Sequence, residues 1–435
     1  MSFLDKLYKA KKIAIVNLGN IVSGDIEEGV IKNADTIFIE VGKIKYVGSQ
    51  GEIDIKEADI IIDANGMTAI PGLIDTHVHL SLEDYAPMHG TLGVLEETLL
   101  WGVTTLISEG EQGRGLPRFY YWDPVGNKIT AILAKKIYER YRPGGLQKIH
   151  AGALVLAEGL KREDFKELAE EGIWLIAEIG GGGLAEVDKL LPMLEWAREF
   201  KFFVSLHWGP GIIPGSKQFT VDEVLAINPD KIAHINGGTT AAPWEWAKEL
   251  IDKTKCGVEI VSYGNPKATY RIIEYLKKKN ELHRVVIGSD TPTGQGYMPN
   301  AIYRALVAIS SLNEIPAEKV IAMATGNTAK LYNKYGYRIN SGFIKEGKDA
   351  DIVLIDKPDG SVGRDALEAI ELGDVVGTAL IMVDGKIVGF RGKDARPTER
   401  NIKINGVEIK IKDINEALFN PIRLYYRSLD PTLKL

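Results

Sequence analysis

Two histidines one residue apart are the strongest chemical signal in this sequence. His77 and His79 lie in Pro71-Gly72-Leu73-Ile74-Asp75-Thr76-His77-Val78-His79-Leu80, where an apolar run leads directly into the pair. Because alternate residues of a strand point to the same face, both imidazoles project together. Two neutral imidazoles on one face suit a transition metal such as zinc or iron. With 7 histidines in 435 residues, a chance His-x-His pair is expected in about one such chain in ten, so the pair needs support.

That support comes from four other polar residues that end apolar segments. Glu178, His207 and His234 close three short apolar stretches, and Asp290 follows a fourth. Taken singly, such a residue is more often a hydrogen-bonded structural side chain, and Asp290 is also suited to capping a helix. Together they predict a metal site, because one edge of a fold would otherwise carry several uncompensated polar groups.

Strands alternating with helices are predicted to position these residues. Helical patterns with charged faces cover Arg162–Glu171, Glu186–Phe200 and Ala268–Lys278. Eight βα repeats over residues 72–333 favour a (β/α)8 barrel, whose active site lies where the strands end. A doubly wound sheet is the alternative, but no Gly-x-Gly-x-x-Gly opens the first helix. The eight expected strands are Gly72–His77, Val103–Ile107, His150–Leu154, Trp174–Glu178, Phe203–His207, Lys231–His234, Gly257–Val261 and Arg284–Gly288.

Shorter strands flank this region on both sides. Four are expected before it, at Lys12–Leu18, Ala34–Val41, Lys43–Val47 and Ile60–Asp63. Three are expected after it, at Ala350–Ile355, Thr378–Val383 and Lys386–Phe390, the last two joined by an Asp384-Gly385 hairpin. Strands at both chain ends can pair, so we expect one small β-domain built from the two termini.

Composition narrows the function classes. The chain is 45% hydrophobic and 26% charged, with a net charge of -6, which argues against a nucleic-acid or anionic-membrane binder. No apolar stretch is long enough to predict a membrane span or a signal peptide. The single cysteine, Cys256, fits a cytoplasmic protein. We therefore expect a cytoplasmic protein that acts on a small-molecule substrate, and we expect it to form a homo-oligomer.

Pro71–Leu80, followed by Gly102-Val103-Thr104-Thr105, resembles the amidohydrolase superfamily of metal-dependent hydrolases. The likeness continues through Ser289-Asp290 and Gly347-Lys348-Asp349-Ala350-Asp351-Ile352-Val353. The resemblance implies a distorted (β/α)8 barrel, here residues 71–334, and a β-sandwich formed by residues 1–70 and 335–435. It also implies five metal ligands, namely His77, His79, His207, His234 and Asp290.

Glu178 departs from the commoner pattern of the superfamily. Many two-metal members supply a carboxylated lysine from the fourth strand, whereas Trp174-Leu175-Ile176-Ala177-Glu178 offers a glutamate. This variant, with the glycine run at residues 180–183, resembles the enamidase-like cyclic amide hydrolases, which have a mixed iron–zinc centre. The resemblance therefore implies two divalent metal ions, zinc and/or iron, with Glu178 as a further ligand.

The leading hypothesis is hydrolysis of the C–N bond of a cyclic amide, a lactam or enamide-like ring, by a metal-bridging hydroxide. His77, His79 and Asp290 would hold one metal ion, His207 and His234 the other, and Glu178 would bridge them. Asp290 would also act as the catalytic acid and base.

Two alternatives stay open. A one-metal deaminase of a heterocycle usually carries a glutamate three residues after the histidine of the fifth strand, where this chain has Pro210. A non-catalytic scaffold derived from such enzymes would have lost ligands.

Substrate contacts are less well specified by the sequence. Trp208, Asn236 and Thr291 each lie within two residues of a proposed ligand, and His89 lies in the loop after the first strand. We expect these four to contact substrate, although each is equally suited to packing a loop. The remaining histidines, His150 and His283, are expected to be structural.

Overall fold

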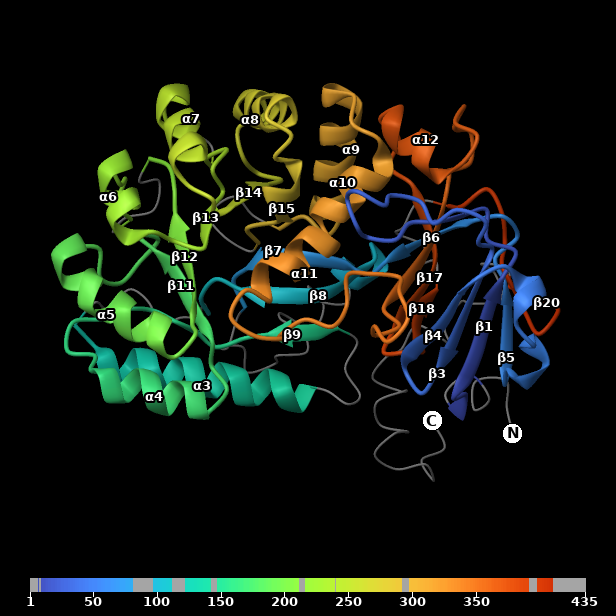
Figure 1. Ribbon diagram of the computed structural model, residues 1–435, viewed down its shortest axis with the longest axis horizontal. Coiled ribbons are helices and arrows are strands. Elements are labelled where there is room, and N and C mark those ends of the chain that lie inside the picture. The colour runs from blue at the N-terminus through green and yellow to red at the C-terminus, as the bar shows by residue number, and fades with distance from the viewer. Residues whose placement is uncertain are drawn as a thin grey trace.

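Strands from both ends of the chain pair in the computed structural model (Figure 1). The structure describes residue 7 and residues 9–80, 97–111, 122–141, 147–210, 216–238, 240–291, 297–390 and 397–409. One mixed sheet has the order β20-β19-β5-β1-β3-β4 and contains β1 Lys12–Val16, β3 Thr36–Glu40, β4 Lys43–Gly48, β5 Ile60–Asp63, β19 Lys403–Ile404 and β20 Val407–Glu408. The other has the order β18-β17-β16-β6-β2 and contains β2 Asn20–Ile21, β6 Thr68–Pro71, β16 Ile352–Asp356, β17 Gly377–Val383 and β18 Lys386–Phe390.

These two sheets share one hydrophobic core. Along β1, Ile13 and Ile15 point to one face and pack in the same cluster as Ile352 and Leu354 of β16. The intervening Ala14 and Val16 belong to a separate cluster on the opposite face, as the two-residue period of a strand requires. Each fully buried isoleucine contributes about 1.5–3 kcal/mol relative to exposure. The two chain ends therefore stabilise each other.

The predicted hairpin is confirmed between β17 and β18. Asp384 has φ 49° and Gly385 has φ 69°, the pair of left-handed residues that a type I′ turn requires. A Cβ on Gly385 would lie 2.8 Å from Cα of Gly42, in the turn between β3 and β4. The glycines thus allow the hairpins of the two sheets to touch.

All eight strands predicted for the central region are present, and they run parallel. A three-stranded sheet contains β7 Leu73–Val78, β8 Val103–Ser108 and β9 Lys148–His150. A six-stranded sheet contains β10 Ala153–Leu154, β11 Leu175–Ile179, β12 Phe203–His207, β13 Lys231–Ala233, β14 Gly257–Val261 and β15 Val285–Gly288. The strand expected at His150–Leu154 is split into β9 and β10, because Gly152 has φ 89° and interrupts the extended backbone.

The last strand of the six-stranded sheet lies beside the first strand of the other. The backbone N–H of Asp290 donates to the carbonyl of His77 at 2.9 Å, and that of His79 donates to the carbonyl of Thr291 at 2.8 Å. β9 and β10 belong to different sheets, so the described parallel strands form two sheets and not one closed sheet. The C-terminal ends of β7 and β15 nevertheless meet, which brings the residues that follow these strands together.

The helices flank the parallel strands, and α4 to α8 follow one another around their outer side (Figure 1). The three predicted helices are confirmed as α4, α5 and α8, with ends that differ by one or two residues. Asn265 caps α8 by accepting from the N–H of Ala268, with Pro266 in the first turn. None of the described helices has both the length and the apolar character that a membrane span requires. The helices are α3 Pro124–Tyr141, α4 Arg162–Glu170, α5 Val187–Glu199, α6 Val221–Ile227, α7 Trp244–Lys253, α8 Pro266–Lys278, α9 Ala301–Asn313, α10 Ala317–Met323, α11 Gly326–Tyr332 and α12 Ala366–Glu371.

Deleting residues 1–65 is expected to yield insoluble protein. The deletion removes β1 to β5 and leaves the apolar face of β16 without its partner sheet. It also leaves β19 without the β5 edge to which it pairs, and unpaired edges promote aggregation. The soluble fraction after expression, compared with the full-length chain made in parallel, checks this expectation. A soluble truncated chain that still binds metal ions would contradict it.

Candidate metal centre

The two histidines of the first parallel strand converge as their spacing predicts. His77 lies within β7 and His79 directly after it, and both rings are buried. Their Nε2 atoms are 3.1 Å apart. At this distance both ring nitrogens could bind the same metal ion.

Glu178 lies between these histidines and those of the next strands. Its Oε2 is 3.0 Å from Nε2 of His234 and 3.2 Å from Nδ1 of His207. Oε2 is also 3.9 Å from Nε2 of His77, and Oε1 is 3.7 Å from Nε2 of His79. The Glu178 carboxylate thus lies within 4 Å of a ring nitrogen of each of the four histidines.

Asp290 completes the group from the end of β15. Its Oδ1 lies 3.5 Å from Nε2 of His77 and 3.4 Å from Nε2 of His79. The structure therefore brings all six predicted ligands together, and they are called the ligand cluster below: His77, His79, Glu178, His207, His234 and Asp290. Two triads within it, His77-His79-Asp290 and His77-Glu178-His234, each have ligand atoms within 4.8 Å of one another.

Two members of the ligand cluster have backbone conformations that side-chain-bearing residues rarely adopt. His234 has φ 33° and Asp290 has φ 57°. Such left-handed conformations are unfavourable for residues with a Cβ and tend to occur at functional sites. They turn the two side chains inward just where β13 and β15 end.

The outward ring nitrogens show which tautomers the histidines adopt. Nδ1 of His79 is 3.0 Å from the carbonyl oxygen of Gly110, and Nδ1 of His234 is 2.7 Å from that of Trp208. A carbonyl oxygen only accepts, so both Nδ1 atoms must carry hydrogen. In the neutral rings, the Nε2 lone pairs then point into the ligand cluster.

When its histidines are neutral, as metal binding requires, the interior of the ligand cluster consists of hydrogen-bond acceptors. Ionised Glu178 and Asp290 can only accept, and in the neutral rings the inward Nε2 atoms of His77, His79 and His234 carry lone pairs. His207 faces Glu178 with its Nδ1, and its Nε2 is buried and has no hydrogen-bond partner among the described residues. Acceptors that face one another need cations between them, and imidazole nitrogens with carboxylates are the donor set of zinc and iron. The residues present thus fit a transition-metal centre.

The pKa values of residues in the ligand cluster are shifted because carboxylates and imidazoles lie close together there. Burial by itself lowers the pKa of His77, but the negative charges of Glu259 and Asp290 outweigh it and raise the pKa to about 10. Burial raises the pKa of Glu178, yet His207 and the hydrogen bonds from the imidazoles hold that pKa well below its usual range. Protons and metal ions compete for such nitrogens, and divalent cations can replace the protons that the free cluster takes up.

The glycine run after β11 makes room for the Glu178 side chain. A Cβ on Gly181 would lie 2.6 Å from Oε1 of Glu178, so the carboxylate packs directly over this glycine. Gly180 has φ 97° and contacts the ring of Phe219. Glycine is therefore required for two different reasons: the Glu178 carboxylate lies too close to Gly181 for a Cβ, and Gly180 has a positive φ.

Replacing Gly181 with alanine is expected to displace the Glu178 carboxylate and to lower kcat by about 10- to 10²-fold, because small misplacements of catalytic groups are costly. The number of metal ions per chain should fall with it. Gly51→Ala is the control, since the nearest atom to a Cβ at that position is Ser49 Oγ at 3.9 Å. Unchanged kcat and metal content in the Gly181 variant would show that the carboxylate does not depend on this glycine.

Two of the residues predicted to contact substrate, Trp208 and Asn236, have contacts with other parts of the protein. Trp208 is fully buried, packs against Trp246 and belongs to the hydrophobic core. The Asn236 side chain donates to the carbonyl of Val261 and to Thr269 Oγ1, so it ties neighbouring loops. Both side chains therefore have structural contacts, and their expected contact with substrate stays a prediction.

The other two residues predicted to contact substrate are Thr291 and His89. Thr291 is buried beside the ligand cluster, where its carbonyl accepts from the N–H of His79 at 2.8 Å. His89 lies outside the described residues. Its expected contact with substrate and that of Thr291 stay predictions.

Several groups around the ligand cluster were not predicted from the sequence, namely the carbonyls of Gly110 and Trp208 and the side chains of Glu109, Lys231 and Glu259. Glu259 accepts from Nδ1 of His77 at 2.8 Å, and Lys231 contacts Glu259. The available signal was a charged residue inside each of two apolar strands, Lys231-Ile232-Ala233 and Gly257-Val258-Glu259-Ile260-Val261. A charge in a fully buried strand requires a partner.

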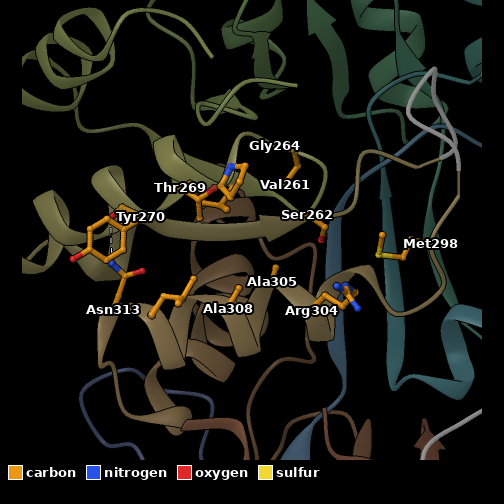
Figure 2. A pocket seen from close by; sticks show the side chains of 13 residues that line it. Val261, Ser262, Gly264, Thr269, Tyr270, Met298, Arg304, Ala305, Ala308 and Asn313 are labelled. Atoms are coloured by element: carbon orange, nitrogen blue, oxygen red, sulfur yellow. Dashed lines mark hydrogen bonds between the residues drawn. The ribbon is translucent and has the colours of Figure 1, made fainter. Parts of the chain in front are cut away.

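A groove of about 190 Å³ lies between α8 and α9, outside the ligand cluster (Figure 2). Val261 and Ser262 border it where β14 ends, and Tyr270 and Asn313 lie at its other end, away from Arg304 and Met298. None of the six members of the ligand cluster lines it. The groove is therefore separate from the ligand cluster.

Comparisons with known proteins agree with this geometry. Residues 239–388 match the Amidohydrolase family. The chain is 41% identical to the enamidase of Eubacterium barkeri over 396 residues, which cover 90% of this chain and 99% of that protein. It is 23% identical to the imidazolonepropionase of Bacillus cytotoxicus over 410 residues, or 79% of this chain and 90% of that protein.

Among solved structures, an enamidase is again similar to this chain. The crystal structure of an enamidase superposes with a TM-score of 0.84 at 40% identity and covers 90% of this chain and 100% of its own. A β-aspartyl dipeptidase of Fervidobacterium islandicum superposes with a TM-score of 0.58 at 16% identity over 92% of this chain and 98% of its own. The second likeness shows a shared fold alone.

Proposed function

This chain belongs to the amidohydrolase superfamily, and from that premise we propose that it hydrolyses the C–N bond of a cyclic amide at a centre of two metal ions. The observation that carries the proposal is the ligand cluster, in which acceptor atoms from five different strands face one another. The choice of a cyclic amide rests on the similarity to enamidase, which spans nearly the whole of both chains.

The ligands divide naturally between two ions. His77, His79 and Asp290 form one triad and would hold the first ion. His207 and His234 both contact Oε2 of Glu178 and would hold the second, with Glu178 shared between the two. Imidazole nitrogen and carboxylate oxygen favour zinc or iron in both positions.

Divalent metal ions bound here would lower the pKa of water toward neutrality and polarise the amide carbonyl. The protein supplies the proton transfers. Asp290 lies at the edge of the ligand cluster, and its side chain is 13% exposed, so it can reach both water and substrate. Asp290 takes a proton from the attacking water and delivers it to the ring nitrogen as the C–N bond breaks. The ring opens to a carboxylate and an amine, and no protein side chain forms a covalent bond.

We also propose that the two parallel sheets are parts of one (β/α)8 barrel over residues 71–334. The hydrogen bonds between the ends of β7 and β15 support this arrangement, and β9 and β10 are successive pieces of the third strand. The two mixed sheets with their shared core would form the β-sandwich of residues 1–70 and 335–435.

A substrate panel tests the proposed function. The purified, metal-loaded protein is incubated with a lactam, a cyclic enamide, a cyclic urea and an acyclic amide, and products are identified by mass. Ring opening by addition of one water molecule is the expected result. Release of ammonia from a heterocycle with the ring intact would favour the deaminase alternative, and activity confined to acyclic amides would contradict the proposal.

A further inference from the structure

Three charged side chains lie buried beneath the ligand cluster. Lys231 and Glu259 are 0% exposed, and Glu109 is 1% exposed. Nζ of Lys231 donates to Oε1 of Glu109 at 2.7 Å, to the carbonyl of Thr76 at 3.1 Å and to Oε1 of Glu259. Buried charges are unfavourable unless they are paired, and apolar side chains of similar volume would suit the core equally well. The group therefore calls for an explanation beyond packing.

Glu259 connects this group to the histidines. Its Oε2 is 2.8 Å from Nδ1 of His77 and accepts from the backbone N–H of His234 at 3.0 Å. Its Oε1 accepts from Thr76 Oγ1 at 2.7 Å as well as from Lys231. One carboxylate thus fixes the ring of one candidate ligand and the backbone of another.

His77 differs from the other inward-facing histidines in its outer partner. His79 and His234 donate to backbone carbonyls, whereas His77 faces a carboxylate. An anionic acceptor makes the imidazole a stronger electron donor than a carbonyl does. His77 is also the one histidine common to both ligand triads. Glu259, the anionic partner, therefore contacts the histidine through which it can affect both triads.

We infer that Glu259 is a positioning residue of the metal centre, held in place by Lys231. Glu259 keeps His77 in the tautomer that turns its Nε2 lone pair inward, and it fixes the backbone of His234 at the turn after β13. Lys231 balances the charge of Glu259 and holds its side chain in position. This inference rests on the proposed function, because it assigns a role toward metal ions.

The test is metal affinity, measured by competition with a chelator on the full-length purified protein. Glu259→Gln keeps the shape of the side chain and removes its charge, and we expect the affinity for zinc to fall by about 10- to 100-fold, as for other outer partners of metal-bound histidines. Asp356→Asn is the control. Asp356, the last residue of β16, is also a fully buried carboxylate, but it pairs with Arg400 and has no hydrogen bond or ion pair to a histidine of the described residues.

Thermal unfolding of the metal-free variants separates positioning from general stability. Both substitutions are expected to lower Tm, whereas only Glu259→Gln weakens zinc binding. Equal zinc affinity in Glu259→Gln and the unsubstituted protein would overturn the inference while leaving the proposed function intact. Failure of the unsubstituted protein to bind zinc or iron would instead overturn the proposed function.

A second variant covers the case in which Glu259→Gln does not fold. Glu259→Asp keeps the charge beside Lys231 but shortens the side chain, which withdraws the carboxylate from His77. We expect weaker zinc binding here as well, and unchanged affinity in this variant would overturn the inference.

Discussion

Replacing Asp290 with asparagine is expected to lower kcat by roughly 10²–10⁴-fold, the range typical of acid–base catalysis. The substitution keeps an oxygen in the same place but removes the group that can bind and release a proton. Asparagine also tolerates the left-handed backbone at this position, where φ is 57°. The hydrogen bond from the N–H of residue 290 to the carbonyl of His77 is unaffected by the change. The fold and the other five ligands should therefore persist.

Metal content must be measured alongside kcat in this variant. If both ions are retained while kcat falls, the loss belongs to proton transfer. Asp290→Ala serves for comparison, since it removes the ligand oxygen as well and should lose a metal ion. A near-normal kcat in Asp290→Asn with both ions bound would remove Asp290 from the proposed mechanism.

Replacing Glu178 with glutamine is expected to cost at least one metal ion per chain and to lower kcat by more than about 10²-fold. That loss exceeds the 10- to 100-fold effect typical of residues that only support a metal ligand. Oε2 of Glu178 lies within 3.2 Å of ring nitrogens of both His207 and His234. A neutral amide has the same shape but cannot offset the positive charge of two cations. Metal analysis of the purified variant checks this expectation, and two tightly bound ions with full activity would show that Glu178 is not the bridge.

Glu178→Lys provides an independent test of the same position. Superfamily members with a lysine there depend on its carboxylation, so bicarbonate would be expected to restore activity if the lysine reached the same point. In this chain the carboxylate packs directly over Gly181, close to the β11 backbone. A carboxylated lysine is longer and would extend past the ligand cluster. We expect no rescue by bicarbonate, and recovery of activity with bicarbonate would contradict this account of the site.

The ligand cluster was predictable because its members lie where parallel strands end. Side chains at or just after the C-terminal ends of parallel strands meet at one edge, and His77, His207, His234 and Asp290 each stand at such a position. The same rule applies to Glu178, which replaces the commoner lysine. The eight strands were predictable from their apolar runs, and the pairing of the chain ends followed from strands left over on both sides. Amino-acid type and position along the chain were sufficient for these features.

Other features depend on side-chain geometry that a single sequence does not contain. Trp208 and Asn236 stand next to ligands in the sequence, but the packing of Trp208 in the core and the hydrogen bond from Asn236 to the Val261 carbonyl depend on local backbone direction. The left-handed conformations of His234 and Asp290 carry only a weak residue signature, since neither is glycine and most Asp and His residues have negative φ. The contact between Glu259 and His77 joins β14 to β7, 182 residues apart in the chain. Such pairs become visible only in three dimensions.

Metal titration of the metal-free protein tests the central claim most directly. Zinc or ferrous iron is added stepwise, and the rate of ring opening of a cyclic amide is recorded against the number of ions per chain. The two-ion centre predicts that activity rises until two ions are bound per chain and then remains constant. A plateau at one ion per chain would indicate the single-metal chemistry of the deaminase alternative, and activity independent of added metal would contradict the proposed centre altogether.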